Sequence, residues 1–159
     1  MLNDDAVLAA AHQSAPEKNW AGNVTYRARA LRTPTSWDEL AEIVATEPRL
    51  RVLGSRHSFN DLADTDGVLV SLAEFADEPI DVSGQTARVP AALRYGDLVP
   101  TLAEHGFALA NLASLPHIAV AGSVTTGTHG SGDRIGSLAT QVAALEMVTP
   151  AGRVRLDRG

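Results

Sequence analysis

The stretch RVLGSRHSFN, Arg51–Asn60, guides the interpretation of the whole chain, because it joins a short apolar run to a tight turn and then to a histidine. The apolar run predicts a buried strand, which the Gly54-Ser55 turn ends. A backbone without bulky side chains can approach a phosphate group and direct its N–H groups at it. An isolated histidine can also simply pack at a loop edge, so the surroundings of His57 have to decide between a functional and a structural interpretation.

Local patterns around this stretch predict a mixture of helices and strands. Residues 36–47, SWDELAEIVATE, begin with a capping box formed by Ser36 and Glu39 and carry apolar residues at helical spacing. A second helix is expected within residues 95–105, with Pro100 in its first turn. Apolar runs bounded by turn residues predict strands at residues 50–53, 68–72, 80–82 and 87–89, and two more between residues 141 and 159.

The composition excludes several functional classes. Nineteen acidic residues against thirteen Lys and Arg give a net charge of −6, and no basic stretch carries aromatic residues, so nucleic-acid binding is not expected. Without cysteine there is no disulfide, thiolate metal site or cysteine nucleophile. The five histidines show none of the close spacings of metal ligands, so no metal is expected. The chain also lacks the GxxxxGK, GxGxxG and GxSxG motifs of nucleotide-binding loops and hydrolases.

The N-terminus resembles neither a secretion signal nor a membrane anchor. Residues 1–18 start with acidic side chains and contain only a short apolar run, so they are expected to be a flexible lead-in. No window approaches the roughly 18 apolar residues of a membrane span. These features predict a cytoplasmic protein with no membrane partner.

A second glycine-rich segment, residues 111–136, has no helical or strand periodicity. Structureless segments of this length inside a compact domain are usually functional. Together with the His57 loop it suggests two loops that hold one extended ligand. The chain then ends on a strand, which suggests that these residues are a fragment of a longer domain.

Three motifs, NWAGNVTYRA, VLGSRHSFND and NLASLPHIAVAGSVTTGTHGSG, resemble the FAD-binding domain of the vanillyl-alcohol oxidase superfamily, in particular its alditol oxidases, in order and spacing. The resemblance implies an α+β fold, a PCMH-type FAD-binding domain of two α/β subdomains that is incomplete at its C-terminus. It places the domain at residues 19–159, with a first subdomain at 19–91 and a truncated second one at 92–159. The substrate-binding cap of the family is not among these residues.

The resemblance also implies which residues bind FAD. In the family the histidine of the G-[ST]-x-H-S-F motif is joined covalently to the flavin 8α carbon, which implies that role for His57. Ser114 resembles a serine near the flavin and substrate, although a turn residue would look the same, and His129 could equally bond its local backbone. The implied cofactor contacts are Val52, Leu53, Gly54, Ser55, Arg56, His57, Ser58, Ser114, Gly122, Ser123, Val124, Thr125, Gly127, His129 and Gly130.

The implied activity is oxidation of the primary alcohol of an alditol, such as xylitol or sorbitol, with oxygen reduced to hydrogen peroxide. The expected partners are therefore a small polyol and oxygen. Two alternatives stay open: an aldonolactone oxidase, which would differ mainly in the cap, and an FAD-binding module without catalysis of its own. One departure concerns the cofactor contact, because Val89-Pro90-Ala91-Ala92 stands where relatives often carry several glycines.

Overall fold

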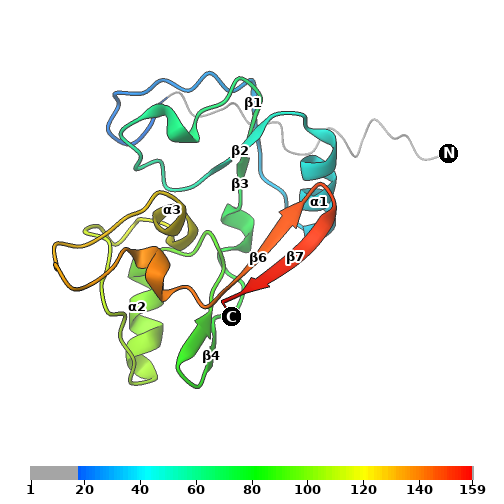
Figure 1. Cartoon of the computed structure of the whole chain (residues 1–159). Helices are drawn as coiled ribbons and strands as arrows, with labels where there is room; N and C mark the ends of the chain where they lie inside the picture. Colours follow the sequence, from blue (N-terminus) through cyan, green and yellow to red (C-terminus); the bar gives the residue numbers. More distant parts are fainter. Residues whose placement is uncertain (1–17, 159) are drawn as a thin grey trace. The chain divides into compact units, whose positions relative to one another are not determined.

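The computed structural model describes residues 18–158, and the chain divides into two compact units. Unit 1 is Met1–Glu74 with Val148–Gly152, and unit 2 is Phe75–Met147 with Arg153–Gly159. Each unit has an apolar core of its own. Figure 1 labels helices and strands. Apart from Lys18, the expected lead-in lies outside the described residues, and the expected subdomain boundary after residue 91 stays a prediction.

Unit 1 is built on a three-stranded parallel sheet with the order β1-β3-β2. The strands are β1 (Ala30–Arg32), β2 (Leu50–Leu53) and β3 (Val68–Ser71), and helix α1 (Trp37–Thr46) joins β1 to β2. The central strand β3 is buried because its residues Val68–Val70 are all apolar. The predicted strands β2 and β3 are confirmed, but β2 is not buried as expected, because Arg51 and Val52 are exposed. Strand β1 is an addition, since three residues are too few to show a period.

Helix α1 begins as its sequence predicts, with one difference in the cap. The Ser36 side chain accepts a hydrogen bond from the Glu39 N–H at 3.2 Å. The Glu39 carboxylate, however, accepts from the N–H of Thr35 at 2.8 Å rather than from that of Ser36. Leu40, Ile43 and Val44 then pack against the sheet as their helical spacing predicts, whereas Trp37, also expected in the core, is exposed.

Unit 2 combines a hairpin, two α-helices, a 3-10 helix and most of a second hairpin. The first hairpin is β4 (Asp81–Ser83) with β5 (Thr86–Arg88), as predicted, and Gly84 turns it with a φ of 58°. The remaining elements are α2 (Tyr95–Glu104), α3 (Val120–Thr125), the 3-10 helix η3 (Leu138–Gln141), β6 (Ala144–Thr149) and β7 (Gly152–Asp157).

Two expectations about unit 2 are corrected. Pro100 is the sixth residue of α2, beyond the first turn where it was expected. The proline costs roughly 3 kcal/mol, but burial of Tyr95, Leu98 and Leu102 contributes roughly 1.5–3 kcal/mol for each side chain, so the helix continues. Residues 111–136 also contain the short helix α3, which small residues and threonines concealed from a periodicity argument.

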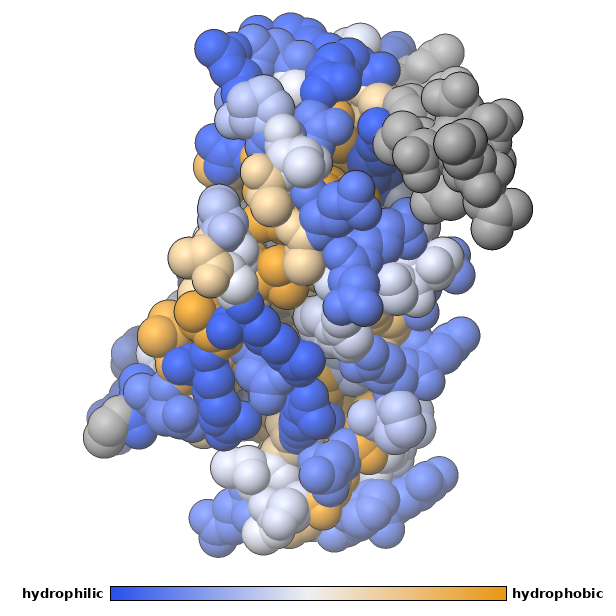
Figure 2. Space-filling model, turned by 90° about the vertical axis from the view of Figure 1, so that its right-hand side faces the viewer, coloured by the Kyte–Doolittle hydropathy of each residue, from blue (hydrophilic) through white to orange (hydrophobic). Residues whose placement is uncertain are grey.

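The surface carries apolar residues among polar ones (Figure 2). In unit 1 the large apolar side chains include Trp20, 56% exposed, and Phe59, 67% exposed. No helix among the described residues is long and apolar enough to cross a membrane.

Candidate cofactor site

The His57 loop lies in unit 1, between the end of β2 and the 3-10 helix η1 (Asp61–Ala63). Among the described residues other than glycine, only Arg56 has a positive φ, 63°. This left-handed conformation costs roughly 1–2 kcal/mol for a residue with a Cβ, so surrounding contacts must hold it. His57 itself is half-buried, and its Nε2 atom is shielded from solvent.

The turn Asn19–Asn23 holds the His57 loop through three hydrogen bonds. The Trp20 N–H donates to the Arg56 carbonyl at 3.0 Å. The Asn19 side-chain amide donates to the Ser58 carbonyl at 2.8 Å, and that of Asn23 to the Phe59 carbonyl at 2.8 Å. Backbone carbonyls on both sides of His57 are therefore fixed by groups far away in the sequence. These bonds involve residues to which the sequence interpretation assigned no role.

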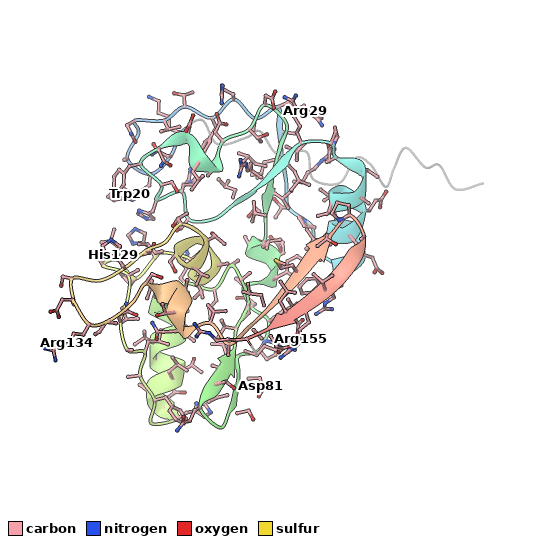
Figure 3. The ribbon with its side chains drawn as sticks, in the orientation of Figure 1. Trp20, Arg29, Asp81, His129, Arg134 and Arg155 are labelled. Carbon is pink, nitrogen blue, oxygen red and sulfur yellow. The ribbon has the colours of Figure 1, made fainter. Side chains whose placement is uncertain are left out.

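The indole ring of Trp20 lies against the imidazole of His57, with ring centroids 4.7 Å apart and an interplanar angle of 37°. Figure 3 labels Trp20 on the first described loop of unit 1. This separation is within the range of favourable aromatic pairs. The contact restricts rotation of the imidazole, so both the backbone and the side chain of His57 have a defined orientation.

A buried carboxylate supports the chain beyond the His57 loop. Asp64 follows η1 and accepts hydrogen bonds from the backbone N–H of Arg27 at 2.9 Å and from its Nε at 2.8 Å. Burial by itself raises the pKa of Asp64, but the hydrogen bonds from Arg27 and Thr65 outweigh it, and the net pKa lies below the ordinary value. Asp64 is therefore held ionised as an anchor between residues 27 and 64.

Ser114 lies in unit 2, on an exposed bend that α2 holds in place. The first backbone N–H groups of the helix, those of Tyr95 and Gly96, donate to the carbonyls of Ile118 and Pro116 at 3.2 and 2.7 Å. A Cβ on Gly96 would come within 3.2 Å of Pro116, which explains the glycine. The bend is thus a fixed part of unit 2.

The side chains of the predicted segment 122–130 mostly bond within unit 2. The buried Ser123 hydroxyl lies 2.8 Å from the Tyr95 hydroxyl and 2.8 Å from the Val120 carbonyl. The Thr125 hydroxyl donates to the Ala121 carbonyl at 2.9 Å. The His129 ring contacts the carbonyl of its neighbour Gly130 at 2.9 Å and lies on the loop after α3, which also carries Arg134 (Figure 3). Of this segment Thr125, Thr126, Gly127 and His129 are exposed.

Packing within the chain does not explain two glycines of segment 122–130, Gly122 and Gly130. A Cβ on Gly67 in unit 1 would lie 2.0 Å from the Arg49 carbonyl oxygen, and one on Gly136 would lie 2.6 Å from a Thr140 methyl group, so the fold requires those glycines. At Gly122 and Gly130 the nearest atoms to a Cβ would be 4.0 and 3.9 Å away, and neither has a positive φ. Close approach of a ligand to the backbone would account for both.

A side-chain pair fixes the rest of this loop. The Gln141 side chain accepts from the Ala110 N–H at 3.1 Å and donates to the Asn111 side-chain oxygen. Asn111 in turn donates to the Gly136 carbonyl at 2.9 Å. The two ends of the glycine-rich segment are therefore tied together inside unit 2. No signal in the sequence pointed to this pair.

The departure noted at residues 89–92 has a structural role. The Ala91 carbonyl accepts from the Ala121 N–H at 3.1 Å, and the Leu93 carbonyl from the Val120 N–H at 2.9 Å. Pro90, whose carbonyl accepts from the Leu93 N–H, is buried. This segment therefore supports the start of α3 through its carbonyl groups.

Unit 2 also has an open, mostly apolar groove of about 290 Å³. Of the predicted cofactor residues, only Val124 lines it. The lining residues are Val124, Ala139, Val142, Ala143, Ala144, Leu145, Leu156, Asp157 and Arg158. Within residues 18–158 no group of three or more His, Asp or Glu side chains gathers as metal ligands.

Comparison with known proteins gives a consistent result. Residues 28–157 match a family described as an FAD binding domain. The chain is 47% identical over 146 residues to an alditol oxidase of a Streptomyces species, and 33% identical over 142 residues to the L-gulonolactone oxidase of Bos taurus. These alignments cover 89% and 86% of this chain but only 35% and 32% of the two relatives, so the chain spans about a third of their length.

Solved structures support the fold. The glucooligosaccharide oxidase of Acremonium strictum, whose title names a 6-S-cysteinyl, 8α-N1-histidyl FAD, has a TM-score of 0.73. Its sequence is 20% identical, and the match covers 89% of this chain and 31% of that one. The α+β fold of a PCMH-type domain is thus confirmed.

The described residues fit the cofactor that this family implies. Unit 1 presents an oriented imidazole beside a turn of fixed backbone, and unit 2 presents a backbone with room at Gly122 and Gly130. The predicted residues 52–58 all lie in unit 1, and residues 114–130 all lie in unit 2. The structure therefore gives the geometry of each of these two sets of residues within one unit.

Proposed function

Because the chain belongs to the FAD-binding domain family, as a PCMH-type domain of the vanillyl-alcohol oxidase superfamily with FAD as its cofactor, we propose that it serves an alditol oxidase. The substrate is the primary alcohol of a polyol such as xylitol or sorbitol, which becomes an aldehyde while oxygen becomes hydrogen peroxide. The identity of 47% with an alditol oxidase carries this proposal. Since the chain covers 35% of that relative, the proposal concerns the longest natural polypeptide that contains these residues.

We assign His57 as the residue that holds the flavin covalently through its 8α carbon. The fixed backbone on both sides of His57 and the indole against its ring support this assignment, because a covalent link needs one defined imidazole orientation. Residues 52–56 and the accessible backbone of residues 122–130 are the proposed contacts to the rest of the cofactor. Ser114 is the proposed residue near the substrate.

When bound, the flavin supplies the hydride acceptor and returns the electrons to oxygen. The described residues contribute binding and orientation: the imidazole tethers the ring system, and the glycine positions let backbone N–H groups approach the cofactor. The alcohol proton requires a base, and we assign that base and the substrate contacts other than Ser114 to the cap domain implied by the resemblance.

An aldonolactone oxidase is the second candidate, because L-gulonolactone oxidase is also a relative. The test mixes the longest natural polypeptide anaerobically with xylitol, sorbitol or L-gulono-1,4-lactone and follows flavin absorbance. Bleaching by the alditols, with one peroxide formed per alcohol oxidised in air, is expected. Bleaching by the lactone alone would transfer the assignment to the second candidate, and an oxidised flavin with all three compounds would refute both.

A further inference from the structure

The turn Asn19–Asn23, NWAGN, makes hydrogen bonds to the His57 loop in addition to those that close the turn itself. It closes on itself, because the Asn19 N–H donates to the Val24 carbonyl at 3.0 Å and the Asn19 side-chain oxygen accepts from the Val24 N–H at 3.1 Å. Gly22 adopts a φ of 74° and donates to the Asn19 carbonyl at 3.1 Å. The turn is thus closed by hydrogen bonds among its own residues and Val24.

Three donors of this turn bond to the His57 loop. The Trp20 N–H and the two asparagine amides reach three carbonyls within four consecutive residues, those of Arg56, Ser58 and Phe59. The Asn19 amide also donates to the Asn23 side-chain oxygen at 2.7 Å, so the two amides are oriented as a pair. Sequence separations of 36 and 39 residues make this a tertiary contact.

The bonded carbonyls determine the path of the backbone through His57. Holding the Arg56 carbonyl limits the peptide plane that precedes the histidine, holding the Ser58 carbonyl limits the plane between Ser58 and Phe59, and the Trp20 ring limits rotation of the imidazole. The bond to Arg56 also stabilises its left-handed conformation. Orientation of a reacting group within a few degrees is what such supporting contacts provide.

We propose that Asn19, Trp20 and Asn23 form a positioning clamp that sets the rate at which His57 is joined to the flavin. This inference rests on the covalent role proposed for His57. In the step, the imidazole nitrogen gives up its proton and forms a bond to the 8α carbon, which loses one hydrogen. The two electrons and two protons pass through the flavin to oxygen, which becomes hydrogen peroxide.

The sharpest test replaces one amide. Asn23→Asp is isosteric and exposed, keeps the oxygen that accepts from Asn19, and replaces the donor to the Phe59 carbonyl with a charged carboxylate oxygen. Asn60→Asp is the matched control, because the same change on the same loop keeps the oxygen that accepts from the Leu62 N–H at 3.2 Å. Apoprotein of the longest natural polypeptide is mixed with saturating FAD, and flavin fluorescence that survives denaturation is followed with time.

Attachment is expected to slow by about fivefold in Asn23→Asp, the effect of losing one hydrogen bond, and to stay at the wild-type rate in Asn60→Asp. Trp20→Ala is expected to slow it further, whereas Trp20→Phe, which keeps an aromatic face, restores most of the rate. Noncovalent FAD affinity and the thermal midpoint of the apoprotein are measured alongside, because a merely structural role would change these and leave the rate at saturating FAD unchanged.

The outcomes distinguish failure of the proposed clamp from failure of the covalent role proposed for His57. If the wild type attaches flavin and Asn23→Asp and Trp20→Ala attach it at the wild-type rate, the clamp is refuted and the role of His57 stands. If Asn60→Asp slows attachment as much as Asn23→Asp, added charge is the cause and the clamp is again refuted. If the wild type never retains flavin after denaturation, the covalent role fails and the clamp fails with it.

Discussion

The two glycine-containing loops are both held by residues distant in the sequence, but by different kinds of contact. In unit 1 the His57 loop contains a left-handed Arg56 and is held by side chains and backbone from a distant turn. In unit 2 residues 120–130 are held by their own hydroxyl groups and by the carbonyls of Ala91 and Leu93, and a Cβ on Gly122 or Gly130 would have no atom closer than 3.9 Å. The difference indicates two tasks: one loop orients a side chain, and the other offers backbone.

The largest expected effect separates the two histidines of these loops. His57→Ala is expected to abolish the flavin fluorescence that survives denaturation, because no other described side chain has the proposed linkage role. His129→Ala is expected to retain it, since that ring bonds only the adjacent Gly130 carbonyl. In-gel fluorescence checks both, and covalent flavin remaining in His57→Ala would contradict the assignment.

The next comparison is between Gly67, where the packing leaves no room for a Cβ, and Gly122, where it does. Gly67→Ala is expected to lower the free energy of unfolding by about 3 kcal/mol, the upper end of the cost of overpacking, because its Cβ would meet the Arg49 carbonyl oxygen at 2.0 Å. Gly122→Ala lies in a helix and is expected to gain up to about 1 kcal/mol.

Gly122→Ala, which is expected to stabilise the fold, is expected to harm cofactor binding. Gly122→Ala is expected to weaken FAD binding by about tenfold, equivalent to roughly 1.4 kcal/mol, because the added methyl group occupies space that the protein leaves free. Denaturant titration and FAD titration of the same variant check the two effects. Unchanged FAD affinity in Gly122→Ala would show that backbone access at this position has no role in binding.

The third expected effect is a pH dependence of unit 1. Because the pKa of Asp64 lies below its ordinary value of 3.8 in the folded protein, its ionised form stabilises the fold above that value. The contribution is lost as the pH falls from 3.8 through the lowered pKa. Asp64→Asn is expected to cost about 1–2 kcal/mol at pH 7 and to flatten this acid limb in urea titrations, and an unchanged limb would contradict the anchoring role.

The smallest effect is expected in the loop of unit 2. Asn111→Ala removes the bond to the Gly136 carbonyl and the contact with Gln141, which should cost about 1 kcal/mol. Hydrogen exchange should become faster at residues 131–136 and stay unchanged in the His57 loop. Gln141→Ala should have a similar effect, and the double variant should cost less than the sum of the two if the pair is coupled.

The sequence predicted those parts of the fold that depend on local pattern. Helix α1, strands β2 and β3 and the β4–β5 hairpin follow from capping, apolar runs and turn residues, and the structure confirms them. Strand β1 and helix α3 were missed because three and six residues are too short for a periodicity signal. Pro100 lies deeper in α2 than local rules predict, since burial of Leu98 and Leu102 outweighs the lost hydrogen bond.

The candidate site divides in the same way. The sequence by itself determined the His57 loop, the glycine-rich loop and the family, because those features are properties of contiguous residues. Only the tertiary structure decided that Trp20 lies on the His57 ring, that two asparagines hold its backbone, and that Ser123 bonds Tyr95. Each of these contacts joins residues at least 28 positions apart, and such pairings depend on the folded path of the chain, which no local pattern of residues encodes.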